Sequence, residues 1–197
     1  MSNVLAKTPL FFVLALAVAS FAQTPATPSQ TAPAAPTPYS VKDDQQDGFT
    51  VVGLTVRTNN AAEKGGQGKI PDLWQGAINS GQLQQIPNQA GDGFVVVYSD
   101  YASDNTGDYN YTLGVRVSSA DKVPAGFVVR KIQAGRYAVI QSETGPPQEV
   151  IPALWQHINA MTPQQLGGAR AYQTDFETYP NITDWGSVQV TAHIGLK

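Results

Sequence analysis

A six-residue segment occurs twice in this chain, and this repeat constrains the fold more than any other feature. Residues 70–75 read Ile-Pro-Asp-Leu-Trp-Gln, and residues 151–156 read Ile-Pro-Ala-Leu-Trp-Gln. The copies lie 81 residues apart, and each is followed by an alternating strand pattern, at 109–117 and at 188–196. A repeat of this length indicates a duplicated module. Two packed copies would form a groove between them, and small ligands usually bind in such grooves. The simpler alternative is that the duplication serves stability alone.

The first 38 residues differ in composition from the rest of the chain. Residues 1–22 carry a single charge, Lys7, before an apolar run that ends in Ser-Phe-Ala at Ala22. This layout is typical of a secretory signal peptide cut after Ala22, and the apolar run is short for a membrane span, which needs about 20 residues. An uncleaved anchor is the alternative. Residues 23–38 contain five prolines and no charge, which favours a disordered linker before a folded domain at 39–197.

These features predict a periplasmic or secreted protein with no stable membrane span after cleavage. The formal net charge of −3 becomes −4 when Lys7 is removed with the signal. Such a mildly acidic domain lacks the basic surface of a nucleic-acid binder, so no nucleic-acid partner is expected. The chain has no Cys, so its stability must come from packing rather than from disulfides. The sequence makes no prediction of oligomeric state.

Hydrophobic spacing predicts two helices and several strands. Apolar residues at i, i+3 and i+4 mark a helix from Ile70 to about Gly81 and another from Ile151 to about Met161, each with a proline in its first turn. Period-two or continuous apolar runs mark strands, at 39–41, 49–57, 94–101, 109–117, 127–130, 137–142 and 188–196. We therefore expect an α+β fold of two strand-helix-strand-strand modules, 39–117 and 124–197. They would have pseudo-two-fold symmetry, an antiparallel sheet with helices on one face, and a central groove.

Four segments resemble the GyrI-like small-molecule-binding family, which is also the AraC-type effector-binding domain of bacterial transcription activators. The similar segments are 49–58, the Leu-Trp helix at 73–74, the strand at 135–140 and Asp-Phe-Glu-Thr-Tyr at 175–179. The resemblance implies two modules that hold a ligand in a central groove. It does not imply DNA binding here, because the chain has no helix-turn-helix, nor gyrase inhibition, because gyrase is cytoplasmic and this chain carries an export signal.

The resemblance also implies a set of ligand-binding residues. In many family members a glutamate at the groove floor pairs with cationic aromatic ligands, and the matching residue is Glu177, flanked by Phe176 and Tyr179. Tyr137 and Trp155 are further candidates for the groove wall. A carboxylate facing an apolar cavity favours a cationic guest, and aromatic walls add about 0.5–2 kcal/mol per cation–π contact. The simpler alternative for Glu177 is an exposed strand residue held by solvent.

Other polar residues carry weaker signals. His157 and His193 lack metal-ligand spacing, so we expect both on the surface and no metal or other cofactor. Residues 63–70 superficially resemble a phosphate loop but lack its first glycine and its Ser or Thr, which indicates a flexible loop instead.

The sequence therefore predicts an exported protein that captures an apolar, cationic aromatic small molecule in the inter-module groove, with Glu177 as the acidic contact. Two alternatives remain open. One is a hydrolase of reactive small molecules in the same groove, with Glu177 as general acid or base and Tyr137 or Tyr179 orienting the substrate. The other is a protein-interaction module of the cell envelope, which a closed groove beside an exposed apolar patch would favour.

Overall fold

The computed structural model describes residues 39–180 and 182–197. The predicted signal peptide, 1–22, and linker, 23–38, lie outside the described residues, so these assignments stay predictions. The strands are β1 (Val41–Gln46), β2 (Phe49–Thr58), β3 (Phe94–Ser99), β4 (Tyr109–Val117), β5 (Val128–Ile132), β6 (Gly135–Gln141), β7 (Thr174–Tyr179) and β8 (Thr191–Gly195). The helices are α1 (Asn60–Lys64), α2 (Ile70–Ser80), the 3₁₀ helix η1 (Gln82–Gln85), α3 (Pro147–Ala160) and α4 (Pro163–Leu166).

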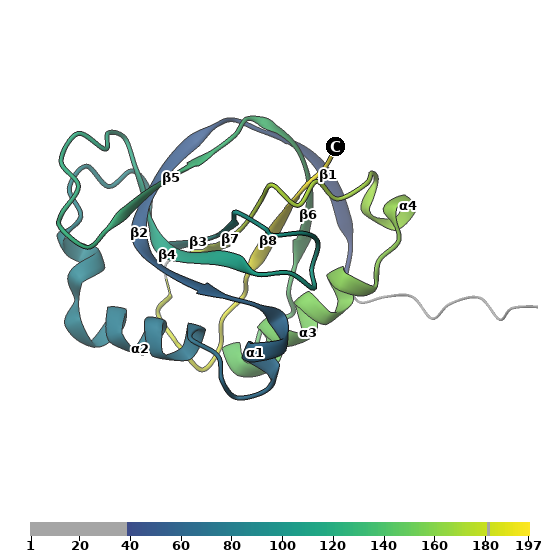
Figure 1. Cartoon of the computed structure of the whole chain (residues 1–197), viewed down its shortest axis with the longest axis horizontal. Coiled ribbons are helices and arrows are strands. Elements are labelled where there is room, and N and C mark those ends of the chain that lie inside the picture. The colour runs from purple at the N-terminus through teal and green to yellow at the C-terminus, as the bar shows by residue number, and fades with distance from the viewer. Residues whose placement is uncertain (1–38, 181) are drawn as a thin grey trace, which may run out of the picture. The chain divides into compact units, whose positions relative to one another are not determined.

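All eight strands form one antiparallel sheet, so the predicted α+β class is confirmed (Figure 1). The strand order is β1-β6-β8-β7-β3-β4-β2-β5. β3 and β7 pair at the centre, and the corresponding strands of the two predicted modules follow outward on each side. This is the order that a two-fold axis between β3 and β7 would produce. The rotation itself stays a prediction.

The first strand of each predicted module pairs with the other module. β1 pairs with β6, where Val41 faces Ile140, and β5 pairs with β2, where Ile132 faces Phe49. The two ladders continue one another in the same register across the short links 47–48 and 133–134. The pair β1–β6 at one end of the strand order therefore continues directly into the pair β2–β5 at the other end. The sheet curves strongly as a result, as Figure 1 shows. Neither module could keep this sheet without the other.

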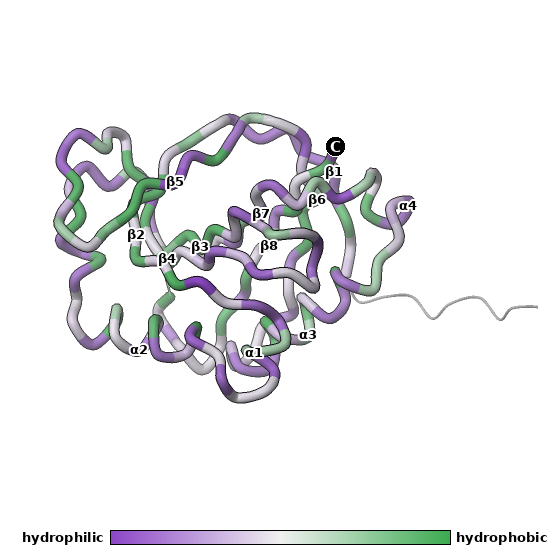
Figure 2. Tube along the Cα trace, in the orientation of Figure 1, coloured by the Kyte–Doolittle hydropathy of each residue, from purple (hydrophilic) through white to green (hydrophobic). Residues whose placement is uncertain are grey.

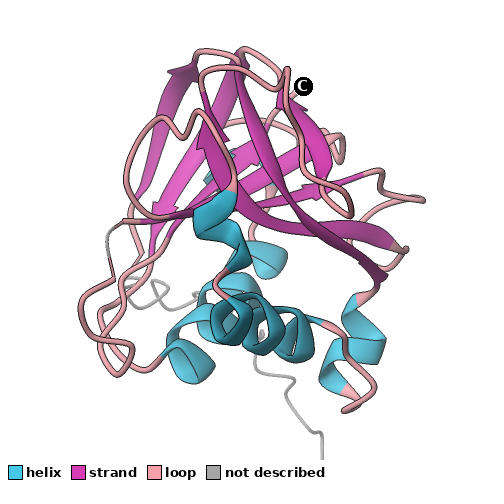
Figure 3. Cartoon of the chain, turned by 90° about the vertical axis from the view of Figure 1, so that its left-hand side faces the viewer, coloured by secondary structure: helices cyan, strands magenta, loops and turns pink. Residues whose placement is uncertain are grey.

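The helices α1, α2 and α3 lie together on one side of the sheet, as predicted, whereas the short helix α4 lies beside β1 and β6 (Figures 1 and 3). α2 begins at Ile70 and ends where Gly81 adopts a left-handed conformation, with φ 63°. α3 begins at Pro147, a full turn earlier than predicted, so Pro152 lies inside the helix and not in its first turn. The earlier start is explained by Pro147 in the first turn, where a missing N–H costs nothing. Figure 2 shows hydrophobic and hydrophilic residues alternating along α2, as expected for a helix with one buried face.

The segment 63–70 is tied to the helix that follows it. Glu63 accepts hydrogen bonds from the backbone N–H groups of Lys69, at 2.9 Å, and Ile70, at 3.4 Å, and from the Thr58 hydroxyl. The first N–H groups of a helix have no partner within the helix, so a carboxylate at this end satisfies them and favours the helix dipole. Glu63 therefore caps α2, and part of the expected loop is the helix α1.

The sheet is packed on both faces. The helix-side face carries the largest cluster of buried apolar residues, including Val96, Tyr98, Tyr111 and Leu113. The opposite, concave face holds a second cluster, made of Val51, Val95, Val97, Ile132, Tyr137 and Phe176, with Phe49 against it. Because successive side chains of a strand point to opposite faces, Phe176 and Glu177 of β7 lie on different faces. This alternation decides which predicted site residues can meet.

Candidate functional site

Glu177 lies at the centre of the sheet, on the face covered by the helices. Its exposed fraction is 0%. The Tyr98 hydroxyl donates to its Oε1 at 3.1 Å, and the Tyr179 hydroxyl donates to its Oε2 at 2.7 Å. The indole N–H of Trp155 also donates to Oε1. The carboxylate is thus held by donors from β3, β7 and α3, elements that are far apart in the sequence.

Five aromatic side chains surround this carboxylate, and we call them the aromatic cage: Trp74, Tyr98, Tyr111, Trp155 and Tyr179. The ring centroids of Trp155 and Tyr98 lie 4.7 Å apart, and those of Trp74 and Tyr179 lie 5.2 Å apart. The Trp74 indole N–H donates to the Tyr111 hydroxyl at 2.7 Å. The three tyrosines are buried, whereas the two tryptophans are half-buried. The repeated tryptophans of α2 and α3 therefore form the outer cover of the cage.

The electrostatics of the cage disfavour negative charge. Burial raises the pKa of Glu177, although the hydrogen bonds from Trp155, Tyr179 and Tyr98 act in the opposite direction. Burial, followed by the nearby Glu177 charge, raises the pKa of Tyr98 well above its ordinary value of 10. Among the described residues, the three ion pairs join other side chains, and none includes Glu177. Its two strand partners, Val96 and Ala192, are uncharged, so no residue directly opposite Glu177 in the sheet supplies a positive charge.

The expectation of an open groove with Glu177 exposed inside it is wrong for this structure. The indole of Trp155 and the rings of Tyr98 and Tyr179 fill the space against the carboxylate, which leaves it no accessible surface. The alternative of a solvated strand glutamate is wrong for the same reason. The group is instead a buried acid within a closed aromatic cluster.

The structure brings together only some of the predicted site residues. Trp155 and Tyr179 contact Glu177 directly. Phe176 and Tyr137 lie in the concave core, with ring centroids 5.3 Å apart, and the Tyr137 hydroxyl donates to the Gln133 carbonyl at 3.1 Å. The sheet separates this pair from the carboxylate. Tyr137 therefore cannot act beside Glu177, as the hydrolase alternative had placed it, whereas Tyr98, Tyr111 and Trp74 belong to the cage.

Both histidines differ from the expectation of solvated surface residues. His193 is 8% exposed, and its ring lies parallel to Phe176, with centroids 4.2 Å apart. His157 is half-buried against Tyr39, with centroids 4.6 Å apart. Nδ1 of His193 and Nε2 of His157 are buried without a hydrogen-bond partner among the described residues. His193 is buried because the concave side of the sheet, where it lies against Phe176, has a core of its own.

We expect His193 to limit stability in acid. Burial lowers its pKa to about 4, and Asp44 opposes this only in part. Because the pKa is lower in the folded state than the ordinary 6.5, His193 is neutral when folded, and protonation favours unfolding as the pH falls from 6.5 to 4. Its contribution to the loss should be about 2–3 kcal/mol. Urea denaturation between pH 7 and pH 4 measures it, with His193→Phe keeping the stacked ring without titrating. Equal pH dependence in both proteins would contradict this.

A buried ion pair lies beside the cage, and no pattern in the sequence predicts it. Asp175 is 0% exposed and accepts hydrogen bonds from Nη2 of Arg170 at 2.6 Å, the Tyr101 hydroxyl at 2.7 Å and the Gly195 N–H at 2.9 Å. The Arg170 guanidinium lies 5.4 Å from the Trp155 ring centroid. The guanidinium donates to Asp175 and to the Asn159 carboxamide, and among the described residues it forms no ion pair with Glu177.

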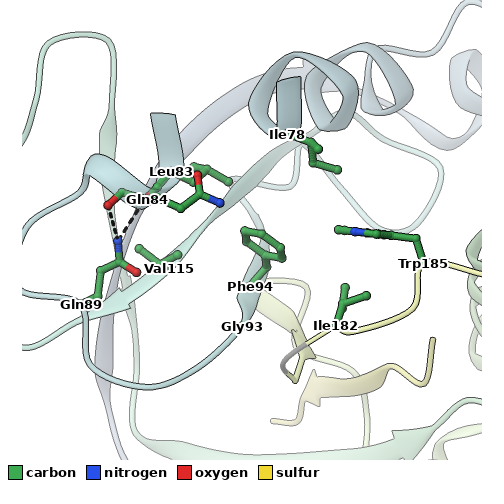
Figure 4. A pocket seen from close by; sticks show the side chains of 9 residues that line it. All are labelled: Ile78, Leu83, Gln84, Gln89, Gly93, Phe94, Val115, Ile182 and Trp185. Carbon is green, nitrogen blue, oxygen red and sulfur yellow. Dashed lines mark hydrogen bonds between the residues drawn. The ribbon is translucent and has the colours of Figure 1, made fainter. Parts of the chain in front are cut away.

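A separate open pocket of about 340 Å³ lies at the C-terminal end of α2, and Figure 4 shows its lining residues. Its walls include Ile78, Phe94, Ile182 and Trp185, and Glu177 is not among its lining residues. Within the described residues there is no group of three His, Cys, Asp or Glu side chains that could hold a metal ion. In the same part of the chain, no helix is long and apolar enough to cross a membrane.

Comparisons with known proteins agree with this fold. The model of the Cass2 family, described as an integron-associated effector binding protein, matches residues 44–194. The chain is 27% identical over 147 residues to YobU of Bacillus subtilis (strain 168), which is named as a transcriptional regulator protein. That match covers 74% of this chain and 90% of YobU.

Two solved structures share the fold. The integron cassette protein from the mobile metagenome of Vibrio cholerae has a TM-score of 0.58 and 23% identity, covering 80% of this chain and 99% of that one. SAV2435 bound to tetraphenylphosphonium has a TM-score of 0.65 and 15% identity, covering 80% and 94%. The resemblance to GyrI-like effector-binding domains is confirmed. Because the family model covers nearly all of the described residues, this chain belongs to the Cass2 family of integron-associated effector binding proteins.

Proposed function

We propose that this protein binds a lipophilic aromatic cation inside the aromatic cage, with the Glu177 carboxylate as its counter-charge. The observation that carries the proposal is a fully buried carboxylate, held by three donors and surrounded by aromatic rings, with no basic side chain paired to it within residues 39–180 and 182–197. An unpaired buried charge is costly, and a cation that enters the cage would compensate it. The faces of the rings would add cation–π attraction.

Entry to the cage requires movement of aromatic side chains and not of the sheet. Trp74 and Trp155 are half-buried and cover the cage from the helix side, whereas Tyr98, Tyr111 and Tyr179 stand on buried strands. Rotation of the Trp155 indole would break one hydrogen bond to Glu177 and open the carboxylate to a guest. The cost of opening lowers the apparent affinity of such a site, so binding is expected to be modest.

Family membership and one neighbour support a small-molecule role over the alternatives. The family is described by effector binding, and SAV2435, which shares the fold, was solved with an aromatic cation. The hydrolase alternative keeps one of its two candidate tyrosines, because Tyr137 lies across the sheet from Glu177 whereas the Tyr179 hydroxyl donates to it. The exposed Ile78 and Trp185 would suit an interaction module, but they line a concave pocket and not a flat patch. The absence of a nucleic-acid partner stays a prediction.

The experiment is a titration with tetraphenylphosphonium and with triphenylphosphine oxide, an uncharged molecule with similar rings, followed by calorimetry. We expect the cation to bind at least about 10-fold more tightly than the neutral compound. Glu177→Gln should remove most of that difference. A 10-fold difference in affinity corresponds to about 1.4 kcal/mol, and the loss of a buried charge interaction is large enough to account for it.

The control is Glu149→Gln, which removes an exposed carboxylate from α3 without touching the cage. It should bind tetraphenylphosphonium as the unaltered protein does. If both substitutions weaken binding equally, the effect is one of overall charge. If neither does, Glu177 is not the counter-charge.

We also propose that the chain is exported, with residues 1–22 removed. The support is the apolar run from Pro9 to Ala22 and the proline-rich segment that follows it. Expression in a bacterial host and N-terminal sequencing of the product would test this. A mature chain beginning at Gln23 is the expected result, and an intact N-terminus in the cytoplasmic fraction would contradict it.

A further inference from the structure

The pocket at the end of α2 has its own chemistry, distinct from that of the aromatic cage. Ile78 of α2, Phe94 of β3 and Val115 of β4 form one part of its wall, and Ile182 and Trp185 face them from the segment before β8 (Figure 4). Its volume, about 340 Å³, is at the small end of the range for ligand sites. No Asp, Glu, Lys, Arg or His is among its lining residues. The pocket therefore suits an uncharged guest, unlike the cage.

Large apolar side chains are left exposed at this pocket. Among the described residues three large hydrophobic side chains are exposed, namely Ile78 at 43%, Trp185 at 40% and Val129 at 37%. Two of the three, Ile78 and Trp185, line the pocket. Trp185 contacts Phe94 and Trp74, with ring centroids 6.3 Å and 5.9 Å away. The Trp185 indole is thus exposed to solvent at the rim of the cavity, beside other aromatic rings. An aromatic guest bound there would bury its exposed surface.

The polar side-chain groups of the pocket are the carboxamides of Gln84 and Gln89 and the indole N–H of Trp185 (Figure 4). The hydrogen bonds of the described residues fix the orientation of the Gln89 amide. Its Nε2 donates to the backbone carbonyls of Leu83 and Ile86, both at 3.0 Å, and to that of Gln84 at 3.3 Å. Its Oε1 is therefore left as a fixed acceptor with no hydrogen-bond donor among the described residues, and it would favour a guest carrying an N–H or O–H donor.

We propose that this pocket is a second binding site for an uncharged aromatic molecule. The molecule would have one ring or two fused rings and would carry a hydrogen-bond donor. The rings would lie against Trp185, Phe94 and Ile78, and the donor would reach Gln89 Oε1. The proposal goes beyond the cation site at Glu177 and does not depend on it. Gly93, which lines the pocket with φ 89°, has no room for a side chain because a Cβ there would overlap the Tyr179 carbonyl.

The test uses 2-naphthol as the probe and 2-methoxynaphthalene, which has the same rings but no donor, as the comparison. Binding is followed by quenching of tryptophan fluorescence and by calorimetry on the full chain. We expect saturable binding of 2-naphthol and at least about 5-fold weaker binding of the methyl ether. Ile78→Glu, which adds a charge to the apolar wall, should weaken 2-naphthol binding at least about 10-fold.

Val129→Glu is the matched control, because Val129 is a similarly exposed apolar residue on β5 that does not line the pocket. It should leave 2-naphthol binding unchanged. Glu177→Gln should also leave it unchanged, which separates this site from the cage. No saturable binding, equal affinity for the two naphthalenes, equal loss in the Ile78 and Val129 variants, or loss in Glu177→Gln would each overturn the proposal.

Discussion

Replacement of Asp175 by Ala should destabilise the protein by about 3–5 kcal/mol, because the change leaves the Arg170 guanidinium buried and unpaired. Asp175 is 0% exposed and the Arg170 side chain is 7% exposed. The same change removes the partners of the Tyr101 hydroxyl and the Gly195 N–H. A loss of this size is a large part of the 5–15 kcal/mol that holds a typical domain together. Chemical denaturation with both fluorescence and circular dichroism would measure it.

Two further variants show whether the loss comes from the unpaired charge. Asp43→Ala breaks the Arg136–Asp43 pair, which has a similar distance of 2.7 Å but is exposed, and it should have little effect. The double substitution Arg170→Met and Asp175→Leu removes both charges and should recover part of the stability lost in Asp175→Ala. If Asp175→Ala and Asp43→Ala behave alike, burial of the pair is not what makes it important.

Affinity for tetraphenylphosphonium should fall as the pH is lowered through the raised pKa of Glu177. Burial raises this pKa above its ordinary value, so the acid becomes neutral at a higher pH than an exposed glutamate would. Only the ionised form can compensate the cation. The binding constant should therefore decrease by up to about 10-fold for each pH unit below that pKa and level off above it.

Proton release provides an independent measure of the same linkage. A bound cation favours the ionised carboxylate and so lowers its pKa, which means that binding below the pKa of the free protein releases a proton. Calorimetry in buffers of different ionisation enthalpy detects this release. Glu177→Gln should show neither the pH dependence nor the proton release. The same pH dependence in that variant would assign it to another group, such as His193.

Local patterns in the sequence were sufficient to predict the elements with strong periodicity. The strand Tyr109–Val117 and the helix from Ile70 to Ser80 were predicted with nearly the observed bounds, because one apolar face sets each pattern. The start of α3 was missed because Pro146 and Pro147 resemble a loop, although Pro147 begins the helix. The pairing of β1 with β6 and of β5 with β2 could not be predicted, since strand partners are chosen by contacts distant in sequence.

The candidate site was predicted in part. The family resemblance named Glu177, Trp155 and Tyr179 as candidate site residues, but it did not predict their hydrogen bonds or the closed cage, because Trp74, Tyr98 and Tyr111 come from other elements. Strand periodicity argues against one pair of these candidates, because Phe176 and Glu177 are neighbours on a strand and cannot both face one groove. The pocket at Trp185 was missed because its walls come from segments with no shared motif.

A crystal structure of the protein with tetraphenylphosphonium would show whether a cation inside the aromatic cage pairs with Glu177. We expect the phosphonium to lie beside the Glu177 carboxylate, with the Trp155 indole displaced from its hydrogen bond and Tyr98 and Tyr179 against the phenyl rings. A cation bound elsewhere, with the Trp155–Glu177 hydrogen bond intact, would rule out Glu177 as its counter-charge.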